Sequence, residues 1–346
     1  NDWQTGLIPV FLAPYQERPG TVFTIHNLAY QGLFSNETFR ALGLPDTLWR
    51  FEQLEFYGQL SFIKGGLVFS DRITTVSPTY AREIQTPEFG NGLDGLLRHR
   101  QHALTGILNG IDTRVWDPEE DQELAFHYGR DHLKNKAQCR AALQHELGLE
   151  VNGAPLLGFI GRLVEQKGVD WIVSVMPDLL EQGCQFVILG SGEDRYEEPL
   201  KQLARQWPGQ FSLTLGYNEG LSHRITAGCD LFLMPSRFEP CGLNQMYSLR
   251  YGTIPVVHGV GGLADTVQDP QQVGIDKANG FVFAGASAAS LLAAIHRALQ
   301  VFEKRKQWRR LQENGMAIDY SWKQRARTYG DLYQGILKER DQQQLD

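Results

Sequence analysis

The chain has 346 residues, of which 42% are hydrophobic and 21% charged, as in folded globular proteins rather than disordered ones. Its 33 Lys and Arg residues and 40 Asp and Glu residues give a formal net charge of −7, which argues against a sequence-independent nucleic-acid binder. No apolar run approaches the roughly 18 residues that a membrane-spanning helix needs, so we expect no membrane partner.

The first half of the chain alternates short apolar runs with helical patterns. The predicted strands are 21–25, 72–76 and 104–108, and the predicted helices are 59–69 and 131–147. Ser77 is a favourable N-cap for a further helix, because Pro78 follows it in the first turn. Gly148 is well placed to end the helix before it.

The second half repeats this rhythm more clearly. The predicted strands are 156–160, 186–189, 211–215, 231–234, 254–257 and 281–283, and the predicted helices are 169–180, 221–228, 243–251, 290–302 and 324–338. Apolar strands that alternate with helices indicate parallel sheets covered on both faces. The sequence therefore predicts an α/β fold with two Rossmann-like, doubly wound domains.

The two halves differ in their number of strands. Six strands suffice for a whole doubly wound domain, whereas the first half has about three, and a β-α unit takes roughly 30 residues. The chain also begins with Asn1 and has its first Met at position 176. We therefore expect an N-terminally truncated first domain at 1–150, a complete domain at 151–320, and a C-terminal helix within 321–346 that crosses back to the first.

Glycines gather where the predicted strands of the second half end. They are Gly161, Gly168, Gly190, Gly192, Gly216, Gly242, Gly261 and Gly262. Ligands of open α/β sheets bind at this edge, where glycine lets a backbone N–H approach an anion. Each glycine alone is more typical of a turn or a helix cap, but the set favours a phosphate-bearing ligand.

The loop after the strand at 156–160 carries two cations, Arg162 and Lys167, which can both reach a diphosphate. It lacks the spacing of a P-loop, and the segment that begins at Gly190 lacks the third glycine of a dinucleotide-binding fingerprint. Such a pair alone is more often a solvated loop than a site. The helix predicted after Gly168 favours the site.

Two further polar residues lie at strand ends. Glu239 precedes a proline, so it is held extended, and its carboxylate can accept hydrogen bonds from sugar hydroxyls. On local grounds an acid that favours the following helix dipole is an equally good interpretation. His26 ends the strand at 21–25, where a lone histidine is more often structural than catalytic.

Together these segments resemble bacterial glycogen synthases and plant starch synthases, retaining glucosyltransferases of the GT-B type. The matching stretches are 1–6 (NDWQTG), 24–32 (TIHNLAYQG), 75–78 (TVSP), 108–112 (LNGID), 161–168 (GRLVEQKG), 235–243 (PSRFEPCGL), 251–253 (YGT) and 261–267 (GGLADTV). The Arg–Lys and Glu loops occur in many nucleotide-sugar transferases. The stretches around His26 and over 238–243 are together specific to this family.

The resemblance implies transfer of glucose from ADP-glucose to the non-reducing-end 4-hydroxyl of an α-1,4-glucan, glycogen or starch, without a metal or other cofactor. Arg162 and Lys167 would bind the donor diphosphate, Glu239 would hold the glucose, and His26 would face it. The other implied residues are Tyr217 on the nucleobase, Gly190, Gly192, Cys241, Gly242, Leu243, Gly261 and Gly262 around the donor, and Asp2 and Asn109 near the sugar or acceptor.

The chain also departs from the family pattern. His258, Val260 and Asn244 replace residues frequent in bacterial members, as in some plant enzymes. The family's donor-binding Lys-x-Gly-Gly-Leu loop is absent, and the similar stretch 64–67 lies inside a predicted helix. We therefore expect this truncated chain itself to be inactive.

The alternative functions are another retaining transferase of the same fold, or a fragment that only binds nucleotide or glucan. The resemblance implies a cytoplasmic location in bacteria and a plastid location in plants.

Overall fold

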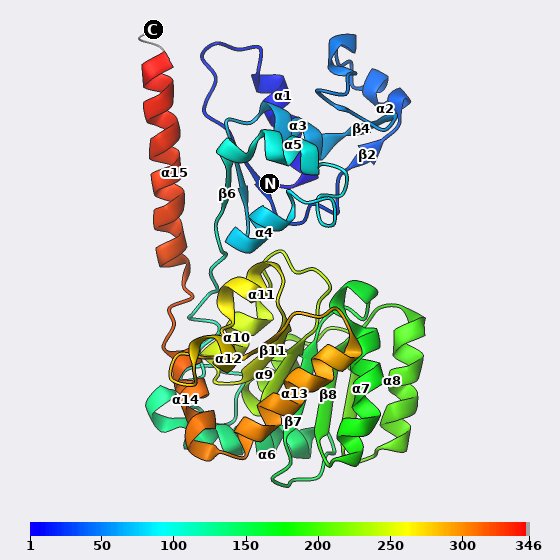
Figure 1. Cartoon of the computed structure of the whole chain (residues 1–346), viewed down its shortest axis with the longest axis vertical. Helices are drawn as coiled ribbons and strands as arrows, with labels where there is room; N and C mark the ends of the chain where they lie inside the picture. Colours follow the sequence, from blue (N-terminus) through cyan, green and yellow to red (C-terminus); the bar gives the residue numbers. More distant parts are fainter. Residues whose placement is uncertain (344–346) are drawn as a thin grey trace. The chain divides into compact units, whose positions relative to one another are not determined.

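The computed structural model describes residues 1–343 and divides into two compact units (Figure 1). One contains residues 1–110 and the C-terminal helix that begins at Trp322, and the other contains Ile111–Ser321. Within the described part of the chain, no helix is both long and apolar enough to span a bilayer.

The second unit is built on one six-stranded parallel sheet. Its order is β12-β11-β10-β7-β8-β9, the doubly wound order that reverses between the first and fourth of its strands in the chain. The strands are β7 (Leu156–Ile160), β8 (Gln185–Gly190), β9 (Phe211–Leu215), β10 (Leu231–Met234), β11 (Ile254–His258) and β12 (Phe281–Phe283). All six were predicted to within a residue.

Helices cover both faces of this sheet, and each face has its own apolar core. One face packs against α7 (Val169–Glu181), α8 (Asp194–Gln206), α13 (Ala288–Phe302) and α14 (Arg305–Met316). The other packs against α6 (Lys136–Glu146), α9 (Glu219–Gly228) and α11 (Gly261–Thr266). The unit also contains α10 (Asn244–Arg250) and α12 (Pro270–Val273). The inner strands β7, β8, β10 and β11 are largely apolar because both of their faces are buried, whereas the edge strand β9 is half-exposed and carries Ser212 and Thr214.

The first unit holds two small sheets. Its parallel sheet has the order β1-β5-β6, and its antiparallel sheet has the order β2-β4-β3. The strands are β1 (Val22–Ile25), β2 (Leu33–Phe34), β3 (Glu55–Phe56), β4 (Gln59–Ser61), β5 (Arg72–Thr75) and β6 (Leu104–Gly106). The helices are α1 (Ile8–Leu12), α2 (Asn36–Ala41), α3 (Phe62–Phe69), α4 (Pro78–Glu83), α5 (Asp94–His99) and α15 (Trp322–Gln343). Short 3₁₀ turns of this unit lie at Trp3–Thr5, Asp46–Leu48 and Gln101–Ala103, and those of the second unit lie at Arg130–Asn135 and Glu165–Lys167.

The helix α15 packs on the parallel sheet of this unit. Ile336 is buried, and a Cβ added at Gly20 would lie 2.6 Å from its Cγ2 atom. Glu339 forms an ion pair with Arg72 on β5. Residues 344–346 of the expected C-terminal element lie outside the described residues.

The structure corrects two predicted helices. The segment 59–69 begins as the strand β4, which pairs with β2 and β3, and Ser61 then caps α3 by accepting a hydrogen bond from the Lys64 N–H. In the segment 131–147, the first turn is a 3₁₀ helix interrupted at His132, and α6 begins only at Lys136.

The division of the chain lies at Gly110 and Ile111, whereas the sequence placed the domain boundary at 150. The segment between these positions packs on the second unit through side chains distant in sequence. Trp116 stacks on His223 and Tyr247, and Tyr128 donates a hydrogen bond to the Tyr251 carbonyl. These contacts place 111–149 with the sheet that follows them.

Candidate functional site

Two loops meet at the carboxyl edge of the six-stranded sheet. The loop 161–168 follows β7, and the loop 235–243 follows β10. Gly168 ends the first loop with φ +67°, and a Cβ there would lie 2.1 Å from the Pro235 carbonyl oxygen of the second loop. Only glycine permits this approach, because any side chain would combine a backbone clash with a left-handed conformation. The cations of one loop thereby come beside the acid of the other.

A short ion pair joins the two loops. Lys167 Nζ lies 2.6 Å from Glu239 Oε2, and the Ser236 hydroxyl donates to the same oxygen at 2.9 Å. Glu239 is only 6% exposed. A charge so deeply buried needs partners, and the ammonium and hydroxyl groups supply them. The carboxylate is therefore held in one orientation.

The backbone of the loop that carries Glu239 is held from the side of Lys167. Gln166 donates to the Phe238 carbonyl at 3.2 Å, and Arg162 donates to the Gln166 side chain at 3.2 Å. The Arg237 N–H donates to the Gln166 carbonyl at 2.8 Å. Gln166 thus links Arg162 to the backbone directly before Glu239.

Arg237 braces the same junction on its outer side. Its guanidinium donates to both carboxylate oxygens of Asp170, at 2.8 and 2.7 Å, and lies over the Trp171 ring at 4.5 Å. These hydrogen bonds lower the pKa of Asp170 and raise the pKa of Arg237. Both groups therefore stay charged, and Arg237 is committed to the scaffold.

Gly261 and Gly262 lie directly against the loop that carries Glu239. A Cβ at Gly261, where φ is +45°, would lie 2.0 Å from the Glu239 carbonyl oxygen, and one at Gly262 would lie 2.0 Å from that of Cys241. The Gly262 N–H donates to the Glu239 carbonyl at 3.1 Å. The Gly262 N–H is therefore engaged by the loop in this structure, whereas the sequence suggested it as a donor to an anion.

Gly242 has φ +69° in the same loop, beside buried Cys241, and Leu243 is the N-cap of α10 without a side-chain cap. The conformation at Gly242 turns the chain from the segment that carries Glu239 toward that helix.

A pocket of about 270 Å³ opens beside Arg162. Its lining residues are Ile160, Gly161, Arg162, Leu189, Gly190, Ser191, Gly216, Tyr217, Ser222 and Asn244. Tyr217 is 84% exposed, which leaves its ring available to stack on a flat ligand. Asn244 donates to the Ile160 carbonyl at 3.0 Å and joins two walls of the pocket.

Gly190, which lines this pocket, and Gly192 let the backbone after β8 pack closely on the loop 161–168. A Cβ at Gly190 would lie 1.9 Å from the Gly161 carbonyl oxygen, and one at Gly192 would lie 2.2 Å from that of Leu163. The Gly192 N–H donates to the Glu197 carboxylate at 3.0 Å. The Glu197 carboxylate therefore already accepts a hydrogen bond from the N–H group that the sequence suggested as a donor to a bound anion.

His26 and its neighbours form a separate group in the first unit. The Asp2 carboxylate accepts the His26 N–H at 2.8 Å, and His26 Nε2 lies 3.0 Å from the Asn1 side-chain oxygen. Asp2 has φ +53°, a conformation that costs free energy in a residue with a side chain. A hollow of about 280 Å³ is lined by Asn1, Val22, Thr24, His26, Asn109, Trp322, Tyr329 and Tyr333.

The structure thus gathers the expected residues into three groups. Arg162, Gly190 and Tyr217 line one pocket, the second group surrounds Glu239, and Asp2, His26 and Asn109 lie together in the first unit. Sequence reasoning missed Ser236, although it lies within the quoted motif 235–243. It also missed Ser222, whose place in a first helical turn carries no local signal.

The stretch 64–67 has a structural role. Lys64 is buried on α3, and its ammonium donates to the carbonyls of Phe51 and Glu55. A Cβ at Gly66 would lie 2.4 Å from the Phe23 ring. Among the residues that the structure describes, no group of three or more His, Cys, Asp or Glu side chains could hold a metal ion.

Known proteins match this chain over almost its whole length. A family model described as "Starch synthase catalytic domain" matches residues 1–99, and one described as "Glycosyl transferases group 1" matches residues 144–314. A glycogen synthase from Marinobacter nauticus is 72% identical over 341 residues, which are 99% of this chain and 70% of the relative. The chain belongs to the glycogen synthase family.

Two further glycogen synthase family relatives agree with this assignment. The glycogen synthase of Cellvibrio japonicus is 60% identical over 97% of this chain and 70% of its own length. The catalytic domain of starch synthase IV from Arabidopsis thaliana, solved with ADP and acarbose, is 38% identical and matches with a TM-score of 0.91 over 97% of this chain and 72% of that one. The protein is therefore a glycosyltransferase of the GT-B fold, as the sequence predicted.

Proposed function

We propose that this glycogen synthase family member transfers glucose from ADP-glucose to the non-reducing-end 4-hydroxyl of an α-1,4-glucan, with retention of configuration. The observation that carries the proposal is the ion pair between Lys167 and buried Glu239, held at 2.6 Å between two glycine-packed loops, one of which carries Arg162. The names of the relatives support a glucan product, and the ADP and acarbose in the starch synthase IV structure support the donor and acceptor classes.

In this proposal Arg162 and Lys167 bind the donor diphosphate. The negative charge that develops on the departing nucleotide needs fixed positive groups near it, and we expect these two side chains rather than a metal or other cofactor to supply them. An ammonium has three N–H donors, so Lys167 can bind a phosphate oxygen without releasing Glu239. The pocket beside Arg162 would take the nucleoside, with the exposed ring of Tyr217 on the adenine.

Glu239 would accept hydrogen bonds from hydroxyls of the transferred glucose. Its second oxygen, Oε1, is the atom we assign to the sugar, because Oε2 already accepts from Lys167 and Ser236. Gly261, Gly262 and the backbone of 241–243 would hold the carboxylate in register with the sugar. A small displacement of such a group costs a large part of the rate.

The first unit would contribute His26 to the transferred glucose. Asp2 would fix the histidine through its backbone N–H, and Asn109 would lie near the sugar or the acceptor. The bacterial relatives support a site of action in the bacterial cytoplasm.

The test is to incubate the full-length protein with ADP-glucose or UDP-glucose, each with and without glycogen. The proposal predicts glucan-dependent release of ADP and longer α-1,4 chains. Product formed without a glucan would favour another retaining transferase of this fold and would overturn the proposal.

A further inference from the structure

The segment that leads into the second unit contains a three-ring stack. The Trp116 ring lies between His223 on α9 and Tyr247 on α10, with centroid distances of 3.7 and 3.8 Å and interplanar angles of 14° and 9°. Trp116 is only 8% exposed. The Trp116 ring therefore separates α9 from α10 at this point and contacts both helices.

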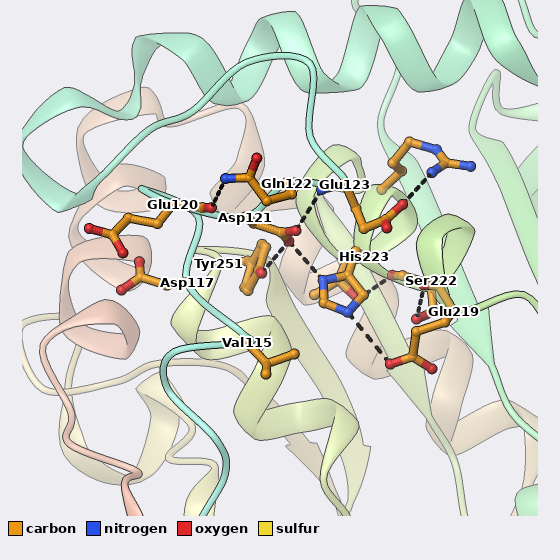
Figure 2. Close-up of polar contacts among 12 residues, drawn as sticks. Val115, Asp117, Glu120, Asp121, Gln122, Glu123, Glu219, Ser222, His223 and Tyr251 are labelled. Carbon is orange, nitrogen blue, oxygen red and sulfur yellow. Dashed lines mark hydrogen bonds and ion pairs between the residues drawn. The ribbon is translucent and has the colours of Figure 1, made fainter.

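A buried carboxylate reinforces the same junction. Asp121 is 4% exposed, and its Oδ2 atom lies 2.8 Å from His223 Nδ1 and accepts the Tyr251 hydroxyl at 2.5 Å (Figure 2). Its other oxygen accepts the Glu123 N–H at 2.9 Å. Burial alone would raise the pKa of Asp121, but the bonds from His223 and Tyr251 outweigh it and lower that pKa.

The chain on both sides of Asp121 is also tied down. Arg250, the last residue of α10, donates to Asp117 at 2.6 Å, and the Tyr128 hydroxyl donates to the Tyr251 carbonyl at 2.8 Å. The segment 112–128 thus contacts α9 and the C-terminal end of α10 at once. We call Trp116, Asp121, His223, Tyr247 and Tyr251 the helix clamp.

Both clamped helices contribute residues to the lining of the pocket beside Arg162. Tyr217 precedes α9, and Ser222 in its first turns lines the pocket directly before His223. Asn244, which lines the pocket from α10, lies one turn before Tyr247. The spacing of these lining residues is consequently set by the stack behind them.

We propose that Trp116 and Asp121 are positioning residues of the nucleotide pocket, whose shape they maintain by fixing α9 against α10. The inference rests on the proposed function, because it takes ADP as the pocket's ligand. Neither residue touches the nucleotide in this account. Both act through Ser222, Tyr217 and Asn244.

The test measures the dissociation constant of ADP by calorimetry, and the melting temperature, for the whole chain and its variants. Trp116→Leu removes the flat ring and should weaken ADP binding about tenfold. Trp116→Phe keeps an aromatic ring in the stack and should stay within about twofold of the unchanged chain. Asp121→Asn removes the charge that orders His223 and should weaken binding about fivefold.

The matched control is Trp308→Leu, which removes an equally buried tryptophan from α14, in the core on the opposite face of the sheet. It should lower the melting temperature without changing ADP affinity. ADP affinity that tracks melting temperature across all four variants, or Trp116→Leu with unchanged affinity, would overturn the inference. If the unchanged chain itself bound no ADP, the proposed function would fail, and this inference with it.

Discussion

Replacing Lys167 by Met would leave the Glu239 carboxylate buried without its ammonium partner. Removing one member of a fully buried ion pair costs about 3–5 kcal/mol. Lys167 is 22% exposed in its side chain and Ser236 still donates to the carboxylate, so we expect about 2–3 kcal/mol here. Glu239→Gln should cost only about 1 kcal/mol, because an amide oxygen still accepts both bonds and only the charge assistance is lost.

These free energies correspond to falls in melting temperature of about 5–10 °C for Lys167→Met and about 2–4 °C for Glu239→Gln. The two variants should separate further in nucleotide binding. Lys167→Met should weaken ADP about tenfold or more, whereas Glu239→Gln should stay within about threefold, because we assign the cation to the diphosphate and the acid to the sugar. Thermal melting and calorimetry with ADP measure both effects. Equal losses of ADP affinity in the two variants, or equal stability, would refute the reasoning.

Gly261→Ala should lower stability by about 2 kcal/mol or more and, in the full-length protein, reduce glucosyl transfer, because its Cβ would lie 2.0 Å from the Glu239 carbonyl oxygen at φ +45°; thermal melting and a transfer assay that both stay unchanged would contradict this. Tyr217→Ala should leave the melting temperature within about 1 °C, since the side chain is 84% exposed, and weaken ADP about five- to thirtyfold, which calorimetry measures. Burial lowers the pKa of Lys136 to about 8, below the pKa of the same lysine in the unfolded chain. Between these two pKa values the unfolded state binds more protons than the folded state, so the contribution of Lys136 to stability rises with pH. Lys136→Met should reduce the increase in the urea midpoint between pH 8 and pH 10. The control variant Lys306→Met, at an exposed position, should leave that increase unchanged.

The sheet of the second unit could be predicted because burial on both faces demands continuous apolar runs, which end at glycine-rich loops. The strand β4 escaped prediction because it is three residues long and runs directly into α3 within one apolar pattern. A period of two cannot be told from a helical period over so short a stretch.

The unit boundary and the helix clamp depend on contacts that leave no local trace. Trp116 meets His223, and Asp121 meets Tyr251, across more than 100 residues of chain. Asp121 also lies in a stretch rich in acids, which in isolation is typical of a solvated loop. Its partners become visible only when α9 and α10 are in place.

In the site, the loops that carry Arg162, Lys167 and Glu239 were predictable because all of them follow strands of a parallel sheet. The roles of the glycines were not, since a sequence cannot show whether a glycine admits a ligand or a neighbouring backbone. Gly192 and Gly262 do the latter in this structure.

The central claim is that the carboxyl edge of the six-stranded sheet binds the donor nucleotide. A crystal structure of the chain with ADP tests it most directly. The account predicts the diphosphate between Arg162 and Lys167, the adenine on Tyr217, and the Glu239 carboxylate still paired with Lys167. ADP bound elsewhere, or with its diphosphate away from both cations, would contradict the account.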